Sequence, residues 1–234
     1  MLFDFPLIEA RFLERINRFT CRVEVNGCVT LAHLHDPGRL DTVLAPDLRL
    51  YLRPVSDIKR RTRYDIILGK IDTGFALINS SFANKVFREV LETKSIESFA
   101  DCTSIKTEFE FRDSRIDFLI GTDDRKQTLV EVKSVTKAIG SKAFFPDAPT
   151  KRGVKHLLTL REALMHGYNT AIVFIIFRNG IESFSPDRKI DPVFADTLYE
   201  AYYEGVKVIA LNTSVGLDSV EVNKELPVEF DLNS

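Results

Sequence analysis

The chain has 234 residues, of which 44% are hydrophobic, and a formal net charge of −2. This length suits one large or two small domains with a core that needs no covalent support, and the small net charge argues against wholesale nucleic-acid binding. The longest apolar run, residues 170–177, is too short to span a bilayer, and no apolar leader opens the sequence. With three cysteines and no CxxC pair, we expect a cytoplasmic protein with reduced thiols and no membrane partner.

The charges are distributed unevenly along the chain. Residues 187–234 hold four cations and ten anions, whereas residues 125–161 hold nine lysines or arginines and two acids. A basic zone beside an acidic tail indicates a polyanionic partner bound at one place. A solvated surface would give the same counts, so the pattern leaves both interpretations open.

The first 80 residues are rich in β-forming residues. Four runs alternate or concentrate such residues, namely TCRVEVNG, CVTLAHLH, LRLYLRPV and YDIILGKI. Turn-forming residues such as Asn26 and Gly27 separate them. Short strands at this spacing predict a small barrel or sandwich, and we favour an OB-like β-barrel over residues 1–80.

The pattern changes near residue 80. Ser80 or Ser81 is a candidate N-cap for a helix that runs to residue 93. The elements that follow are strands at 105–111, 115–121 and 128–134, a helix at 150–166, a strand at 170–177, a helix at 191–204 and a strand at 206–211. This order predicts a mixed-sheet α/β (α+β) domain over residues 81–234.

Three charged residues lie within the apolar strands of this second half. Side chains alternate along a strand, so Glu131 and Lys133 project from one face together. The expected buried side consists of Val130 and Val132 on one strand and Ile116, Phe118 and Ile120 on the other. If the two strands form a hairpin, opposed residue numbers must sum to an even value. A turn centred on Asp124 sets Asp117 opposite Glu131, whereas a turn centred on Arg125 sets Asp117 opposite Lys133.

This grouping predicts a metal-dependent hydrolytic site. Two carboxylates this close repel each other unless a positive charge lies between them. Mg²⁺ prefers oxygen ligands, typically one or two carboxylates with waters and substrate phosphates, and Lys133 would then orient a water or hold a phosphate during phosphodiester hydrolysis. The alternative is a solvent-facing salt bridge between the strands, because an acid-x-lysine triplet occurs five times in this sequence.

Basic residues supply candidate nucleic-acid contacts in two segments. The basic start of the helix near residue 150 is a good seat for a phosphate, and cations on an OB-like barrel can follow a nucleic-acid backbone. Basic residues that only face solvent would give the same sequence pattern, so that alternative stays open. The candidates are Lys151, Arg152 and Lys155 in the helix, and Arg15, Arg18, Arg39, Lys59, Arg60, Arg61 and Arg63 in the barrel.

Two further groups have a plainer interpretation. Phe144 and Phe145 could stack on a base, but burial under the sheet is the favoured interpretation. Two histidines and two cysteines lie near one another in the barrel half, at His33, His35, Cys21 and Cys28. Their spacing matches no common zinc finger, so zinc is not expected.

The whole chain resembles the sugar fermentation stimulation protein A family. The segments that carry the resemblance are RFLERINRF, NSSFANKV, SRIDFLI, VEVKSVT, FFPDAPTKRGVKHL and FSP at 184–186. The resemblance implies an N-terminal OB-like barrel, a domain similar to PD-(D/E)xK nucleases, and DNA binding. It gives Asp117, Glu131 and Lys133 the places of the two motif acids and the lysine. Ile116 stands where the motif has its proline.

Further acids follow from the same resemblance. Glu108, on the preceding strand, takes the place of an additional acid, although a tight turn at Asp113 and Ser114 would bring Glu110 nearer to Asp117. Glu89, on the first helix, lies where such nucleases often carry another acid.

We therefore expect a DNA-binding protein with Mg²⁺ (or Mn²⁺) held by Asp117 and Glu131, with no small-molecule cofactor and with homodimerisation left open. The second hypothesis is a non-enzymatic DNA-binding regulator of sugar metabolism genes that retains the nuclease fold. A third is an interaction module whose acids bind a structural cation.

Overall fold

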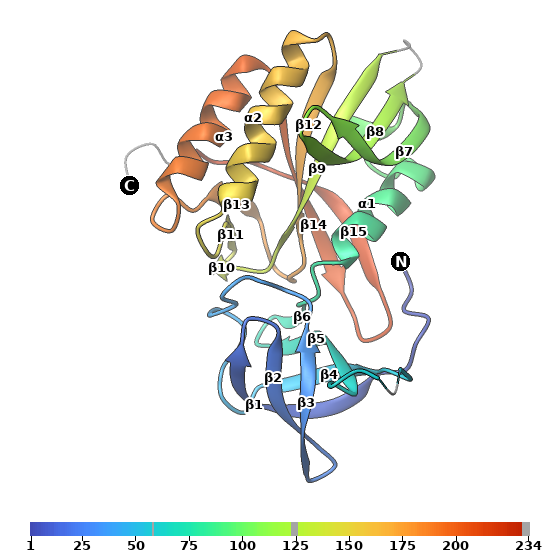
Figure 1. The fold of residues 1–234 in the computed structure, drawn as a ribbon, viewed down its shortest axis with the longest axis vertical. Helices are drawn as coiled ribbons and strands as arrows, with labels where there is room; N and C mark the ends of the chain where they lie inside the picture. Colours follow the sequence, from blue (N-terminus) through green and yellow to red (C-terminus); the bar gives the residue numbers. More distant parts are fainter. Residues whose placement is uncertain (58, 123–125, 231–234) are drawn as a thin grey trace.

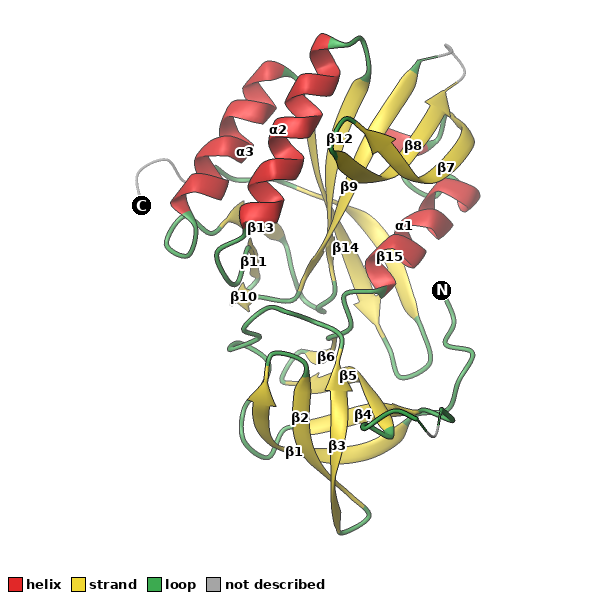
Figure 2. Cartoon of the chain, viewed as in Figure 1, coloured by secondary structure: helices red, strands yellow, loops and turns green. Residues whose placement is uncertain are grey.

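The N-terminal part of the molecule is a closed β-barrel. The computed structural model describes residues 1–57, 59–122 and 126–230. The barrel strands are β1 (Ile8–Asn17), β2 (Thr20–Val25), β3 (Cys28–Leu34), β4 (Arg49–Pro54), β5 (Tyr64–Ile71) and β6 (Gly74–Leu77). Their order is β3-β2-β1-β4-β5-β6, and a parallel pairing of β3 with β5 closes the barrel (Figures 1 and 2). This arrangement confirms the predicted OB-like barrel.

Alternating side chains fill the barrel. Cys21 and Val23 on β2 and Ala32 and Leu34 on β3 are fully buried, whereas the residues between them face outward. Burial that alternates from residue to residue is expected for a sheet with one face in the core and the other in solvent.

The second part is a six-stranded mixed sheet with helices on both faces. Its strands are β7 (Cys102–Phe111), β8 (Ser114–Thr122), β9 (Gln127–Val135), β12 (Asn169–Ile176), β14 (Lys207–Val215) and β15 (Val220–Leu226). Their order is β15-β14-β12-β9-β8-β7, with β12 parallel to both of its neighbours. The helices are α1 (Phe82–Thr93), α2 (Lys151–Met165) and α3 (Pro192–Glu204). Figure 2 shows α2 and α3 side by side over one face and α1 away from them. The predicted mixed sheet is confirmed.

Short elements complete this part, and the sequence did not predict them. They are a 3₁₀ turn at Glu97–Phe99, β10 (Ala138–Ile139), β11 (Lys142–Phe145) and β13 (Ser183–Pro186). The strand β15 was also missed, because its polar, acidic sequence has little apolar alternation. β10, β11 and β13 form a small separate sheet close to the start of α2.

The register between β8 and β9 matches one of the two alternatives. Phe118 pairs with Val130 and Leu119 with Leu129, so opposed numbers sum to 248, the value expected for a turn centred on Asp124. That residue itself lies outside the described ranges. The ladder ends at the Phe118 pair, and the two strands separate just where Asp117 and Glu131 follow.

One expectation about the faces was wrong. Ile116 packs into the core beneath α2 and α3, whereas Phe118 and Ile120 pack against α1. The regular alternation therefore fails between Ile116 and Phe118, at Asp117, and Glu108, across from Asp117 in the β7–β8 register, has a left-handed backbone with φ of 54°. Among the described residues, no helix is long and apolar enough to cross a membrane.

Candidate active site

Asp117 lies where β8 and β9 part, and both of its carboxylate oxygens are held. Oδ1 accepts a hydrogen bond from Asn84 Nδ2 of α1 at 2.8 Å, and Oδ2 accepts one from the backbone N–H of Val132 at 2.8 Å. That N–H is available because Val132 lies beyond the end of the β8–β9 ladder. The splayed strands thus fix the orientation of the aspartate.

Glu131 is 2% exposed and faces the start of α2. Its Oε1 is paired with both Lys133 Nζ and His156 Nδ1. Lys133 Nζ also lies 3.3 Å from His156 Nδ1, and Arg152 Nε lies 3.4 Å from His156 Nε2. Glu131, Lys133 and His156 therefore form one connected group between β9 and α2.

The second oxygen of Glu131 is left open. Glu131 Oε2 is buried and has no hydrogen-bond partner among the described residues. A buried carboxylate oxygen without a donor costs free energy of about 1–3 kcal/mol or more, so such an atom points to a missing partner. The orphaned oxygen belongs to the same residue for which the sequence predicts a metal-binding role.

The charges around the two acids shift their pKa values in opposite directions. Burial, together with the nearby charge of Glu131, raises the pKa of Asp117. Burial alone would also raise the pKa of Glu131, but Lys133 and His156 outweigh it and hold that pKa below its usual value. The pair thus places one firmly ionised carboxylate beside one that resists ionisation, which is the situation that a bound cation would relieve.

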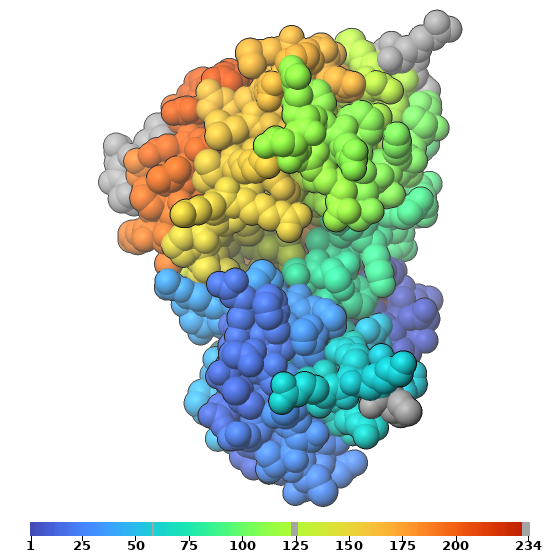
Figure 3. Space-filling view, viewed as in Figure 1, coloured from blue at the N-terminus to red at the C-terminus, as the bar shows by residue number. Residues whose placement is uncertain are grey.

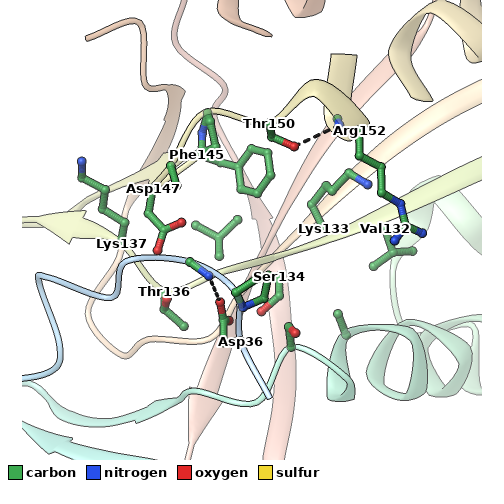
Figure 4. Close-up of a pocket in the computed structure, with 18 of the residues that line it drawn as sticks. Asp36, Val132, Lys133, Ser134, Thr136, Lys137, Phe145, Asp147, Thr150 and Arg152 are labelled. Carbon is green, nitrogen blue, oxygen red and sulfur yellow. Dashed lines mark hydrogen bonds between the residues drawn. The ribbon is translucent and has the colours of Figure 1, made fainter. Parts of the chain in front are cut away.

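A cavity of about 790 Å³ opens onto these residues. It extends from Asp117 and Glu131 past the start of α2 to the barrel loop that contains Asp36. Figure 4 shows Lys133 and Arg152 on one side of this cavity and Asp36 and Asp147 on the other. Figure 3 shows the hollow between the barrel and the α2 region. The site is therefore accessible to a ligand that approaches between the two parts.

The additional acids named in the sequence lie outside this cavity. By register Glu108 is opposite Asp117, but it is exposed and its Oε1 lies 3.7 Å from Arg115 Nη2. Glu110 is exposed and lies opposite Arg115 in the β7–β8 strand register. Glu89 Oε2 lies 2.8 Å from the N-terminal ammonium group. Their participation stays a prediction.

Three of the predicted phosphate-binding cations already have structural partners. The Arg15 guanidinium donates to four backbone carbonyls, including that of Gly38 at 2.6 Å. Arg60 Nη2 donates to the buried Asp65 at 2.6 Å, and Lys155 Nζ lies 3.0 Å from Asp113 Oδ2. The remaining candidates are exposed, and they are Arg18, Arg39, Lys59, Arg61, Arg63, Lys151 and Arg152.

Phe145 packs against Phe174 and Phe194, with ring centroids 5.4 and 5.1 Å away. Phe144 and Phe145 are both only partly buried and both line the cavity, so full burial under the sheet is not what the structure shows. His35 is directed to Asp65, with Nε2 3.1 Å from Oδ1, and Cys21 is buried.

The structure adds two residues that the sequence interpretation did not include. His156 lies one turn after Arg152 on the inner side of α2, and Asn84 lies in the first turn of α1. Neither has a local sequence signal, because each reaches the site only through the packing of a helix on the sheet. Over the described residues, no group of three or more His, Cys, Asp or Glu side chains is arranged to hold a metal. A cation here would therefore rest on two carboxylates and complete its shell with water and substrate oxygens.

Comparisons with known proteins agree with this architecture. The model for the SfsA N-terminal OB domain matches residues 13–78, and the model for the sugar fermentation stimulation protein RE domain matches residues 81–219. A sugar fermentation stimulation protein homolog from Desulfitobacterium hafniense is 41% identical over 224 residues, covering 95% of this chain and 96% of the relative. A homolog from Methanosphaera stadtmanae is 38% identical over 228 residues, covering 94% of each.

One solved structure is similar over nearly the full length. It is Pyrococcus furiosus SfsA in complex with Ca²⁺, which superposes with a TM-score of 0.89 at 30% identity and covers 98% of both chains. The chain therefore belongs to the sugar fermentation stimulation protein family.

Proposed function

We propose that this chain binds DNA and hydrolyses phosphodiester bonds with a divalent cation, Mg²⁺ or Mn²⁺, held by Asp117 and Glu131. In this proposal residues 1–80 form the nucleic-acid-binding barrel and residues 81–234 form the nuclease-like domain. The observation that carries it is Glu131 Oε2, a buried oxygen with no partner among the described residues, next to a second carboxylate at the mouth of a cavity.

The donor set fits a hard cation. Both candidate ligands are carboxylates, which Mg²⁺, Mn²⁺ and Ca²⁺ accept, and the backbone N–H of Val132 together with Asn84 orients one of them. A similar protein of the family was solved with Ca²⁺, which supports a divalent cation without specifying Mg²⁺. When bound, the cation would activate a water and stabilise charge on the phosphate.

The neighbouring side chains have roles that do not depend on that cation. Lys133 Nζ is a positive charge at the cavity edge, where it can bind a non-bridging phosphate oxygen and stabilise charge that develops on it. His156 donates toward Glu131 Oε1, which leaves Oε2 as the oxygen available to a ligand. Arg152, exposed at the start of α2, extends the same positive surface outward.

The test is a cleavage assay with several DNA and RNA forms in Mg²⁺ or Mn²⁺. The wild-type chain is compared with Asp117→Ala and Lys133→Ala, and we expect each change to reduce cutting by a factor of about 100 or more. Glu221→Gln is the matched control, since it neutralises an exposed acid of the same sheet, on β15 away from the cavity, and it should cut like the wild type.

Two results would count against hydrolysis at this site. Cutting that survives both substitutions would come from another site or a contaminant. DNA binding without cutting under any condition would favour the second candidate, a non-enzymatic DNA-binding regulator. One observation favours that candidate: Glu131 Oε1 is already paired with two nitrogen groups, Lys133 and His156, which neutralise much of the local charge.

A further inference from the structure

A row of aromatic rings lies on the outside of the barrel. Phe19 is 44% exposed, and its ring lies 6.2 Å from that of His33 at an interplanar angle of 23°. The His33 ring lies 4.2 Å from that of His35. We call Phe19, His33 and His35 the ring row.

The barrel geometry explains why these rings face outward. Ala32 and Leu34 are buried in the barrel, so the alternation of β3 directs His33 to the outer face. His33 pairs with Thr20, and the Leu34 N–H donates to the Phe19 carbonyl, which brings the β1–β2 turn alongside β3.

Positive charge flanks the ring row. In the parallel β3–β5 pairing, His33 is opposite Asp65 at the start of β5, so the loop between β4 and β5 ends beside the rings. Lys59, Arg61 and Arg63 of that loop are exposed. Asp65 itself is fully buried and paired with Arg53 and Arg60, so it presents little negative charge to a ligand. Asp57 is the exposed acid of the loop, and its Oδ1 accepts from the Lys59 N–H.

The ring row is next to the cavity that contains the candidate active site, because chain neighbours of its residues line that cavity. Arg18, which precedes Phe19, lines that cavity, as does Asp36, which follows His35. The Ser80 hydroxyl donates to the His35 carbonyl at 2.6 Å and lines the cavity too. Figure 3 shows the barrel face directly below the hollow.

We propose that the ring row binds single-stranded nucleic acid, with bases stacked on Phe19 and His33 and phosphates held by Lys59 and Arg61. Aromatic side chains with free faces can stack on unpaired bases, whereas the bases of a duplex are already stacked on each other. Strand 3 and the β1–β2 and β4–β5 loops together make the surface with which such barrels meet oligonucleotides. The inference rests on the proposed function in that both assign nucleic-acid binding to the barrel, and the strand would continue past Arg18 toward Asp117.

The test is fluorescence anisotropy with a labelled oligo(dT) of about 16 nucleotides and a duplex of the same length, in EDTA so that no strand is cut. The single strand should bind more tightly than the duplex. Phe19→Ala should weaken single-strand binding about 5- to 150-fold, and Phe19→Trp should restore it. The matched control is Tyr203→Ala, which removes an exposed ring of α3, and it should leave affinity unchanged.

A second variant makes the result independent of how well Phe19→Ala folds. Replacing both Lys59 and Arg61 with Gln should flatten the slope of log Kd against log salt by about 1.4 for a single strand. The inference is overturned if Phe19→Ala binds within twofold of the wild type, if the salt slope is unchanged, or if duplex binds as tightly as single strand. If the ring row fails these tests but cutting still depends on Asp117, the proposed hydrolytic site stands and the ring-row inference falls. If nothing is cut but Phe19→Ala weakens binding, the ring-row inference stands and the proposed hydrolysis falls.

Discussion

Two buried carboxylates, one in each part of the molecule, differ in how many of their oxygens have a hydrogen-bond or ion-pair partner. Asp65 in the barrel is 0% exposed, and both of its oxygens are paired: Oδ1 with Arg60 and His35, and Oδ2 with Arg53. Glu131 in the sheet is 2% exposed and has Lys133 and His156 on Oε1 but no partner for Oε2 among the described residues. The saturated group supports the fold, whereas the open one is the better candidate for a ligand site.

The pKa values express the same difference. Burial alone would raise the pKa of Asp65, but its hydrogen bonds from Arg60, Arg53 and His35 outweigh burial and lower the pKa to about 2. Next to Glu131, by contrast, burial and a second negative charge raise the pKa of Asp117. The Asp65 cluster is therefore complete without a further cation, whereas a bound cation would stabilise the cluster of Asp117 and Glu131.

The largest expected effect on stability comes from breaking the ion pairs of Asp65. Asp65→Asn should lower the free energy of unfolding by about 3 kcal/mol, because it leaves two guanidinium groups without their charged partner. Glu131→Gln should change it by about 1 kcal/mol, because Lys133 can turn toward the water of the cavity. Urea unfolding at pH 7 measures both. Equal losses in the two variants would contradict the distinction between a structural and a functional carboxylate.

Acid should remove the contribution of Asp65 next. Its pKa in the folded chain, about 2, is below the ordinary value of 3.8, so its stabilisation is fully present above pH 4 and is lost as the pH falls through 2. The shift corresponds to about 2 kcal/mol. The stability difference between the wild type and Asp65→Asn should therefore shrink between pH 5 and pH 2. A difference that stays constant over this range would show that ionisation of Asp65 does not contribute.

In the group of Glu131, Lys133 and His156, the change His156→Ala should weaken binding of a divalent cation about 10-fold. Groups that orient a metal ligand typically contribute a factor of 10–100 to metal affinity. His156→Gln, which keeps a donor, should recover part of the loss. His166→Ala is the matched control, because His166 lies at the exposed end of the same helix and contacts Arg112 and the carbonyl of Glu162. Calorimetric titration of the three variants gives the ranking. If His156→Ala and His166→Ala bind the cation equally well, His156 does not position Glu131.

The smallest expected effect is at the barrel loop that contains Asp36, whose Leu40 N–H donates to Asp147 of the second part. Burial, with the charge of Asp147 nearby, raises the pKa of Asp36 to about 6. The neutral form is thus favoured in the folded chain, so the stabilising contribution is present below pH 4 and is lost as the pH rises through 6. Asp36→Asn should consequently be more stable than the wild type by about 1 kcal/mol at pH 7.5 and equal to it near pH 4.

Denaturation at these two pH values checks the prediction for Asp36. A variant that is less stable than the wild type at pH 7.5 would show that the ionised group is needed to hold the Gly38 N–H, which donates to Asp36 Oδ1 at 2.8 Å.

The parts of this comparison differ in how far sequence could predict them. One of the two even-numbered registers matches the β8–β9 pairing, whereas strict alternation, which expects Ile116 and Phe118 on one face, fails at Asp117. His156 and Asn84 could not be found this way, since a helix reaches a sheet at an angle and height that its own sequence does not determine. The Asp65 cluster was missed for a related reason: Arg60 lies in a basic run typical of a solvated loop, and its buried partner is five residues further along the chain.

The most direct measurement is a calorimetric titration of Ca²⁺ into the wild type, Glu131→Gln and Asp65→Asn. We expect one cation per chain in the wild type and in Asp65→Asn, under conditions where that variant is folded, and no binding in Glu131→Gln. Equal binding by Glu131→Gln and the wild type would contradict the assignment of Glu131 as a cation ligand.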